Sequence, residues 1–220
     1  MRKCLLLLVI AVVGAACSTV PTPKPSRFVS LGNQRAYDAF DNPKTSWDVF
    51  SLNSDQALFR IQNSVLEGAV IPNQGYIWSL NNLSYNDAAV SATVQQTKGS
   101  RGNGFGVMCR ANEQGDGYYF VISSAGQFAI LKGQAGVADP VRLVGWQSSS
   151  AIHQGNEPNT LQAICAGDYL SFSVNGQFLA DATDSEFSSG KFGMVLAGVD
   201  QTLWVSFDDI IIRDATLVGA

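Results

Sequence analysis

The chain has 220 residues, of which 46% are hydrophobic and 15% are charged. This apolar share excludes a disordered polymer, and the length suffices for one large all-β domain or two small domains. Fourteen basic residues stand against 18 acidic ones, which gives a formal net charge of −4. Without a basic field to hold phosphate backbones, nucleic acid is not an expected partner.

Residues 1–16 have the pattern of an export signal. A basic Met-Arg-Lys start is followed by an apolar run over residues 5–13, which is shorter than the roughly 20 residues of a membrane-spanning helix. The segment Gly14-Ala15-Ala16-Cys17 resembles the lipobox of bacterial lipoproteins, although Gly14 departs from the branched residue of that motif. The resemblance implies removal of residues 1–16 and acylation of Cys17. Ordinary signal cleavage with plain secretion stays open as the alternative.

Residues 17–36 are predicted to be a lipidated cysteine followed by a proline-rich tether. Prolines occupy positions 21, 23 and 25, and alternating prolines favour an extended, semi-rigid chain. We therefore expect a cell-envelope protein held to a membrane through Cys17, at the outer membrane or the cell surface. Ser18, in place of an aspartate, favours the outer membrane. Without acylation the same protein would be secreted.

Two cysteines remain for the folded part of the chain, because Cys4 lies in the signal and Cys17 is the lipid site. An even pair in an exported protein predicts a disulfide between Cys109 and Cys165. In the chain-entropy model, closing such a loop stabilises the fold by ~4 kcal/mol. The alternative is a reactive thiol pair, but neither close Cys-x-x-Cys spacing nor a neighbouring histidine or lysine supports it.

From Trp47 onward, short runs of β-branched and aromatic residues alternate with Gly, Asn, Asp and Ser. Asn175-Gly176 is the sharpest turn signal, since both residues favour the positive φ of a type I′ hairpin. No later window shows a strong helical period. We predict one all-β domain over residues 37–215, folded as an antiparallel two-sheet sandwich. The expected strands are 57–62, 65–71, 76–80, 88–96, 104–111, 118–123, 127–132, 160–166, 169–174, 177–182, 190–197 and 202–213.

Several segments in this order resemble one group of exported bacterial domains. They are Asp38-Ala39-Phe40-Asp41-Asn42-Pro43 with Trp47, residues 104–110 (GFGVMCR), 119–123 (YFVIS), 159–167 (NTLQAICAG), Val174-Asn175-Gly176 and Phe207-Asp208-Asp209. The group is the concanavalin A-like, laminin G-like jelly-roll sandwich. Some of its members lie near a family named for hydrolysis of 3-keto-disaccharides, and others are appended to receptors and kinases. The resemblance therefore implies a fold and leaves binding and hydrolysis equally open.

The sequence shows no convincing catalytic constellation. Sandwich glucanases carry Glu-x-Asp-x-Glu on a strand, and none of the four glutamates here begins that motif. The densest acidic segment, residues 181–186, is interpreted as solvated turn residues. His153 is the only histidine and is interpreted as a loop residue. The resemblance also allows a structural calcium near Asp200, Asp208 and Asp209, although no Asp-x-Asp-x-Asp loop is present.

The remaining functional hint is a set of aromatic and polar side chains. If Phe105, Val107 and Cys109 face the core, strand alternation turns Arg110 to the opposite, accessible face. Tyr119 would join Arg110 there only if Tyr118, Phe120 and Ile122 point inward on the neighbouring strand. Gln162 is a further polar candidate for binding a ligand such as a glycan. The alternative is an ordinary solvated face. An aromatic platform for sugar rings is a further possibility, formed by the tryptophans 47, 78, 146 and 204 and the tyrosines 118, 119 and 169. The alternative for these residues is burial in the core, where most aromatic residues of a sandwich lie.

The leading hypothesis is a lipid-anchored envelope protein whose jelly-roll domain binds a glycan or a partner protein without catalysis. One alternative is a hydrolase that acts on a 3-keto-disaccharide or a related sugar. A second alternative is a purely structural envelope protein.

Overall fold

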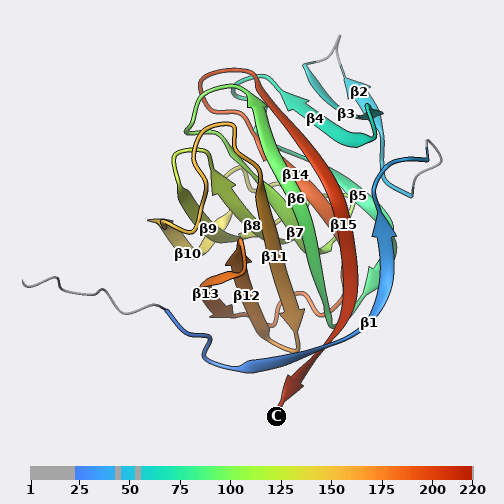
Figure 1. The fold of residues 1–220 in the computed structure, drawn as a ribbon, viewed down its shortest axis with the longest axis vertical. Coiled ribbons are helices and arrows are strands. Elements are labelled where there is room, and N and C mark those ends of the chain that lie inside the picture. The colour runs from blue at the N-terminus through green and yellow to red at the C-terminus, as the bar shows by residue number, and fades with distance from the viewer. Residues whose placement is uncertain (1–22, 43–45, 53–55, 220) are drawn as a thin grey trace, which may run out of the picture.

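The computed structural model describes residues 23–42, 46–52 and 56–219. These residues form fifteen strands in two antiparallel sheets (Figure 1), so the predicted all-β sandwich is confirmed. The described part of the chain holds no helix long and apolar enough to cross a membrane. The predicted signal over residues 1–16 and the predicted lipid site at Cys17 lie outside the described residues.

The larger sheet has nine strands in the order β13-β12-β11-β6-β15-β4-β3-β2, with β1 also paired to β15. The sixteen-residue β15 is long enough for β4 and then β1 to pair with successive parts of it. The strands are β1 (Phe28–Asp38), β2 (Phe50–Leu52), β3 (Ala57–Gln62), β4 (Val65–Val70), β6 (Ala88–Lys98), β11 (Asn159–Ala166), β12 (Tyr169–Val174), β13 (Gln177–Thr183) and β15 (Leu203–Val218).

The smaller sheet has six strands in the order β10-β9-β8-β7-β14-β5. Its strands are β5 (Tyr76–Tyr85), β7 (Gly104–Ala111), β8 (Gly117–Ser123), β9 (Gln127–Gly133), β10 (Val141–Ser148) and β14 (Gly190–Ala197). The hairpin turn predicted at Asn175-Gly176 is present. Asn175 and Gly176 have φ values of 52° and 76°, as a type I′ hairpin requires.

The main core fills the space between the sheets. Strand alternation sends Phe105, Val107 and Cys109 of β7 into this core, and the neighbouring β8 adds Tyr118, Phe120 and Ile122, all at most 1% exposed. Phe172 of β12 packs from the opposite sheet against Phe120 of β8 and Phe128 of β9, with its ring centroid 5.6 Å and 6.4 Å from theirs. The sandwich is therefore closed by interdigitating aromatic and branched side chains.

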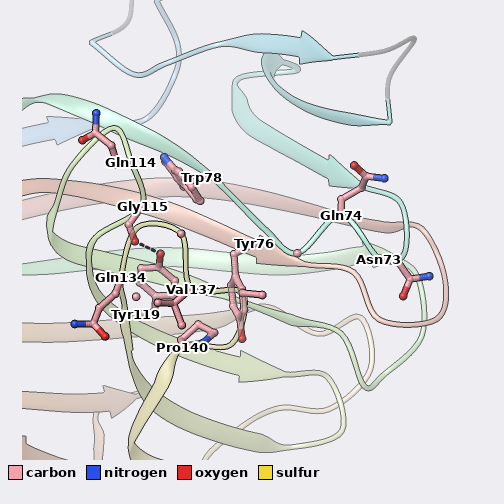
Figure 2. A pocket seen from close by; sticks show the side chains of 14 residues that line it. Asn73, Gln74, Tyr76, Trp78, Gln114, Gly115, Tyr119, Gln134, Val137 and Pro140 are labelled. Carbon is pink, nitrogen blue, oxygen red and sulfur yellow. Dashed lines mark hydrogen bonds between the residues drawn. The ribbon is translucent and has the colours of Figure 1, made fainter.

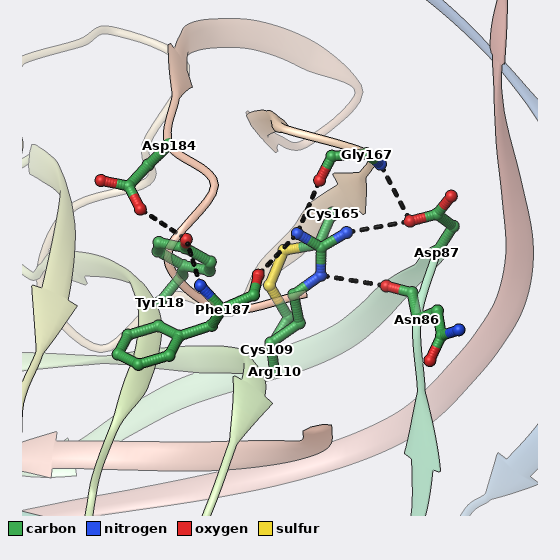
Figure 3. The surroundings of a disulfide bond; sticks show 9 residues. All are labelled: Asn86, Asp87, Cys109, Arg110, Tyr118, Cys165, Gly167, Asp184 and Phe187. Atoms are coloured by element: carbon green, nitrogen blue, oxygen red, sulfur yellow. Dashed lines mark hydrogen bonds and ion pairs between the residues drawn. A yellow bond between two sulfur atoms is a disulfide. The ribbon is translucent and has the colours of Figure 1, made fainter. Parts of the chain in front are cut away.

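The predicted disulfide is present and joins the two sheets. Cys109 of β7 and Cys165 of β11 are bonded, are at most 1% exposed and are 56 residues apart in sequence (Figure 3). The cross-link thus joins an interior strand of each sheet, near the C-terminal end of β7 and of β11.

Three strands were not predicted: β1, β2 and β10. Of the three, β1 changes the domain organisation most. Residues 28–36 fall within the predicted tether, but in the structure they pair with β15. Its side chains are mostly exposed, so no alternation of polar and apolar residues marks it as a strand. It is held by backbone pairing, by an ion pair from Arg27 to Asp168, and by a 2.7 Å ion pair from Arg35 to Asp214. An unpaired tether therefore ends no later than residue 27.

Candidate functional site

The outer face of the six-stranded sheet carries a second, smaller apolar cluster. Its members are Leu80, Met108, Ala111, Tyr119, Val121, Ala129, Leu131 and Val195, with Tyr76 and Trp78 packed against them. Every buried member is at most 3% exposed, although this face points away from the main core. Most outer faces of antiparallel sandwiches are polar and solvated. This face is therefore covered by something other than the second sheet.

Loops supply that cover and leave two hollows over the sheet, while a third, of about 310 Å³ and lined by Phe50, Leu52, Tyr76, Ile77 and Trp78, lies at the β5 edge beside β2. The first hollow has a volume of about 440 Å³ and lies between the β4–β5, β7–β8 and β9–β10 loops (Figure 2). The second has a volume of about 230 Å³ and lies beside β10. Tyr76, the first residue of β5, lines both hollows. Small residues at outward positions of the sheet line them, namely Gly133 in the first hollow and Gly104 and Ala197 in the second.

The floor of the first hollow depends on a glycine at position 115. Gly115 has a φ of +88°, and a Cβ added there would lie 2.5 Å from the Trp78 ring. The Tyr119 hydroxyl donates a hydrogen bond to the Gly115 carbonyl, visible as the dashed line in Figure 2. Gly133 is equally constrained, since a Cβ there would meet the Tyr119 hydroxyl at 2.3 Å. Trp78 and Tyr119 thus pack closely against the β7–β8 loop at Gly115, and Tyr119 also packs against Gly133 at the end of β9.

Tyr76 and Trp78 are the partly exposed aromatic residues of the first hollow. The Tyr76 ring packs at 5.5 Å from the Tyr119 ring. Burial raises the pKa of the Tyr76 hydroxyl, and the negative charge of Asp139 adds to this effect while Arg142 opposes it. The group therefore stays a neutral phenol at ordinary pH, able both to donate and to accept a hydrogen bond.

The second hollow is bounded by Trp146 of β10. This side chain is 37% exposed, and its ring lies over Gly104 of β7, at ordinary contact distance from where a Cβ would stand. Ser123 and Gln127 add polar groups to the lining. Ser123 is 1% exposed, and its Oγ has no hydrogen-bond partner among the described residues.

The lining of both hollows is uncharged. In the first it consists of Asn73, Gln74, Gly75, Tyr76, Trp78, Gln114, Gly115, Tyr119, Gly133, Gln134, Gly136, Val137, Ala138 and Pro140. In the second it consists of Tyr76, Gly102, Gly104, Ser123, Gln127, Trp146, Ala197 and Val199. Aromatic rings, amides and hydroxyls are therefore the groups available to a ligand, and neither described lining offers a carboxyl group.

The expectation that Arg110 faces an accessible surface is wrong. The cysteine side of β7 is the core, as expected, but the Arg110 side chain is only 2% exposed. Its backbone has a φ of 52°, and the pairing of β7 with β14 is irregular at this point, so simple alternation fails. Arg110 donates to the carbonyls of Asn86, Gly167 and Phe187 and to the Asp87 carboxylate, at 2.7–3.0 Å (Figure 3). Arg110 therefore holds β7 to three other segments of the chain and is not placed to bind a ligand.

Tyr119 and Gln162 are not brought together. Tyr119 lines the first hollow, as the ligand hypothesis requires, but it is 3% exposed and its hydroxyl already bonds Gly115. Gln162 lies on β11 in the other sheet, where its amide is 3.4 Å from the Ser91 hydroxyl. The predicted cluster of arginine, tyrosine and glutamine does not exist as one site.

The acidic segment of residues 181–186 is partly solvated, as expected, but Asp184 is more buried than a solvated turn residue would be. Asp184 accepts hydrogen bonds from the Tyr118 hydroxyl at 2.6 Å and from Lys132 at 2.7 Å, and Glu186 also pairs with Lys132 at 2.7 Å. Burial disfavours the charged form of Asp184, yet these donors outweigh it and lower its pKa. Both carboxylates are thus held ionised by one lysine, which does not suit a general acid.

The other candidate ligands of a metal do not converge. Among the described residues, no three His, Cys, Asp or Glu side chains group together in a way that could hold a metal ion. Asp200 accepts a hydrogen bond from Ser100, whereas Asp209 on β15 accepts one from the Tyr37 hydroxyl at 2.9 Å. His153 is exposed in a loop, in agreement with its interpretation from the sequence.

The four tryptophans divide into distinct roles. Trp47 is buried in the main core, and Trp204 on the outer face of β15 is covered by Arg60 and Lys98, each 5.3 Å from its ring. Trp78 and Trp146 line the hollows. Sequence reasoning named both among its aromatic residues but missed Tyr76, and it missed β10 altogether. The run of β-branched, apolar and aromatic residues in Val141–Trp146, bounded by Pro140 and three serines, is the signal that could have revealed β10.

Comparison with known proteins identifies the fold. The chain matches no protein-family model, and its sequence matches no curated protein. Among solved structures, the carbohydrate-binding module CBM66 from Bacillus subtilis is 21% identical, with a TM-score of 0.61 over 77% of this chain and 96% of that one. A B. subtilis protein with a galectin-like fold is 11% identical, with a TM-score of 0.63 over 86% and 99%. The GH43 protein BlXynB from Bacillus licheniformis gives 11% and 0.59 over 83% and 40%. The chain therefore has the jelly-roll fold found in carbohydrate-binding and glycosidase structures.

Proposed function

We propose that this protein binds a carbohydrate in the hollows on the outer face of its six-stranded sheet and does not cleave it. The observation that carries the proposal is the lining, in which Tyr76, Trp78 and Trp146 accompany amides and hydroxyls. Aromatic rings pack against the apolar faces of sugar rings, while neutral polar groups bond sugar hydroxyls. The fold that the chain shares with the B. subtilis carbohydrate-binding module supports the same conclusion.

Hydrolysis of a glycosidic bond requires two carboxyl groups about 5–9.5 Å apart beside the substrate. The described linings contain none, and the acidic pair Asp184 and Glu186 is engaged by Lys132. Similarity to glycosidases is a similarity of fold, and fold does not carry activity. Binding without cleavage is thus the better-supported function. We extend the proposal to a cell-envelope protein anchored through Cys17, which a mass measurement of the mature N-terminus would test.

The binding proposal is tested with full-length protein on an array of neutral and acidic glycans, followed by titration calorimetry on the best ligand. Tyr76→Ala should weaken binding by about tenfold or more, because Tyr76 lines both hollows. Tyr37→Ala is the matched control, since Tyr37 is 54% exposed on the other sheet. Chromatography of the bound sugar, with 3-keto-disaccharides included, should show no products. Equal affinity of parent and Tyr76→Ala would contradict the proposal.

A further inference from the structure

We propose that the two hollows are adjacent subsites for a single uncharged oligosaccharide, which lies across Tyr76 and ends against Trp146. This inference rests on the proposed carbohydrate binding and specifies its ligand. The two hollows meet at one side chain, Tyr76, at the start of β5. A chain of sugars in the first hollow that extends past Tyr76 toward β10 would therefore enter the second, whereas one that extends toward β2 would reach the hollow lined by Phe50 and Leu52.

Trp146 is suited to be the platform of the second subsite. Of the four tryptophans it is the most exposed, whereas Trp47 is buried and Trp204 is covered by two cations. Its ring is supported from below by the β7 backbone at Gly104. An exposed aromatic ring on the rim of a hollow offers a sugar ring a flat apolar surface that is already in position, so little ordering cost accompanies binding.

Ser123 gives an independent indication that the second hollow takes a polar ligand. It stands at the end of β8, lines this hollow, and is 1% exposed with no partner for its Oγ among the described residues. Buried hydroxyls are normally hydrogen-bonded, so an orphan one calls for an explanation. Because the Oγ has almost no accessible surface, a small rotation of the Ser123 or Gln127 side chain would be needed to expose it to a ligand hydroxyl, and a sugar carries such hydroxyls on every ring.

The uncharged linings determine the class of sugar. A uronic or sialic acid would bring a carboxylate into hollows whose described linings hold no lysine, arginine or histidine. Arg142 lies near Tyr76, but Asp139 lies near it as well, so the local charge is balanced. Removing a carboxylate from water without a partner is costly. The site should therefore prefer neutral sugars over acidic sugars of the same length.

The test uses full-length protein and two ladders of one to six sugar units. The neutral ladder consists of xylan-, glucan-, mannan- and fructan-derived oligosaccharides, and the acidic ladder consists of oligogalacturonates and oligoalginates. Affinity for the best neutral series should rise about tenfold between one and three units and then level off. Acidic oligomers of equal length should bind at least tenfold more weakly.

Two variants assign the gain in affinity to the second hollow. Trp146→Ala should remove this roughly tenfold gain from chain extension and leave affinity for the monosaccharide unchanged. Ser123→Ala should weaken the longer oligomers by about three- to tenfold. Trp204→Ala, on the opposite sheet, is the control for loss of a tryptophan, and thermal unfolding of each variant verifies folding.

The outcomes separate the two proposals. If neutral sugars bind through Tyr76 with no dependence on length, and Trp146→Ala has no effect on any oligomer, the two-subsite inference is wrong while carbohydrate binding stands. Tight binding of acidic oligomers would overturn the preference for neutral sugars. Absence of binding across both ladders would overturn the proposed function, and this inference with it.

Discussion

Removing the Arg110 side chain should destabilise the protein more than removal of any exposed arginine. Arg110 lies at the end of β7, beside the disulfide, and donates four hydrogen bonds. Three go to backbone carbonyls in separate segments and one to the Asp87 carboxylate, which also accepts the backbone N–H of Gly167 at 2.8 Å. In Arg110→Ala these acceptors lose their donor while most of the surroundings stay buried.

The expected loss follows from burial and the number of bonds. A hydrogen bond to a charged group contributes ~1.5–3 kcal/mol, but four such values do not add. The Asp87 side chain is 46% exposed, so water can replace part of its interaction, whereas the Arg110 side chain is 2% exposed. Breaking a buried charged cluster costs ~3–5 kcal/mol. For a protein of this size that corresponds to a fall in Tm of roughly 6–20 °C.

The assay is urea unfolding at neutral pH without reductant, followed by tryptophan fluorescence. Arg110→Lys, which keeps the charge but loses the forked donor geometry, should fall between parent and Arg110→Ala. Arg35→Ala is the control, because Arg35 is 54% exposed in its pair with Asp214 and should cost at most ~1 kcal/mol. If Arg110→Ala unfolds within about 1 kcal/mol of the parent, the guanidinium does not hold these segments together, and the reasoning is refuted.

Further predictions concern the cross-link, the floor of the first hollow and the acidic segment. The double variant of Cys109 and Cys165 to alanine should lose about 4 kcal/mol of unfolding free energy, since the bond closes a long loop, and reductant should then no longer affect stability. Gly115→Val should abolish sugar binding in calorimetry, because the new side chain would overlap Trp78; unchanged affinity would contradict the role of this glycine. Tyr119→Phe, which leaves the Gly115 carbonyl without its donor, should cost ~1–3 kcal/mol in denaturant unfolding. The pKa of Asp184 is lowered in the folded state, so its stabilisation is present above the unfolded pKa and is lost as the pH falls below ~4. Asp184→Asn should flatten that acid limb of a pH titration of stability, and an equally steep limb in the variant would count against the assignment.

Local patterns in the sequence were enough to predict most of the sandwich. Alternation of core residues on β7 and β8 was correct, as was the turn at Asn175-Gly176. The disulfide was predicted from cysteine count and export alone, and the structure confirms it. These features depend on neighbours in sequence or on a residue type that has few alternatives, which is why they are readable without coordinates.

The features that were predicted wrongly or missed depend on contacts between segments that are distant in sequence. Arg110 was placed on the wrong side because a positive φ and an irregular pairing with β14 interrupt the alternation of β7. The first hollow is assembled from three loops and from a glycine, Gly115, whose importance comes only from Trp78 packed beneath it. Tyr76 looks like any other strand residue until its place between the two hollows is known. The local periodicity of a sequence does not show which distant loops come together around a pocket.

The pairing of β1 with β15 places the two ends of the described domain side by side. Phe28 is in register with Val218, and Figure 1 shows the start of β1 crossing the end of β15 near the C-terminus. Antiparallel partners lie about 4.5–5.5 Å apart at their Cα atoms, so a few residues would suffice to join them. A circular permutant with these ends joined and a new start at the Asn175-Gly176 hairpin would therefore preserve every loop that encloses the hollows. Because its two ends lie close together, the domain should also tolerate insertion into a surface loop of a host protein.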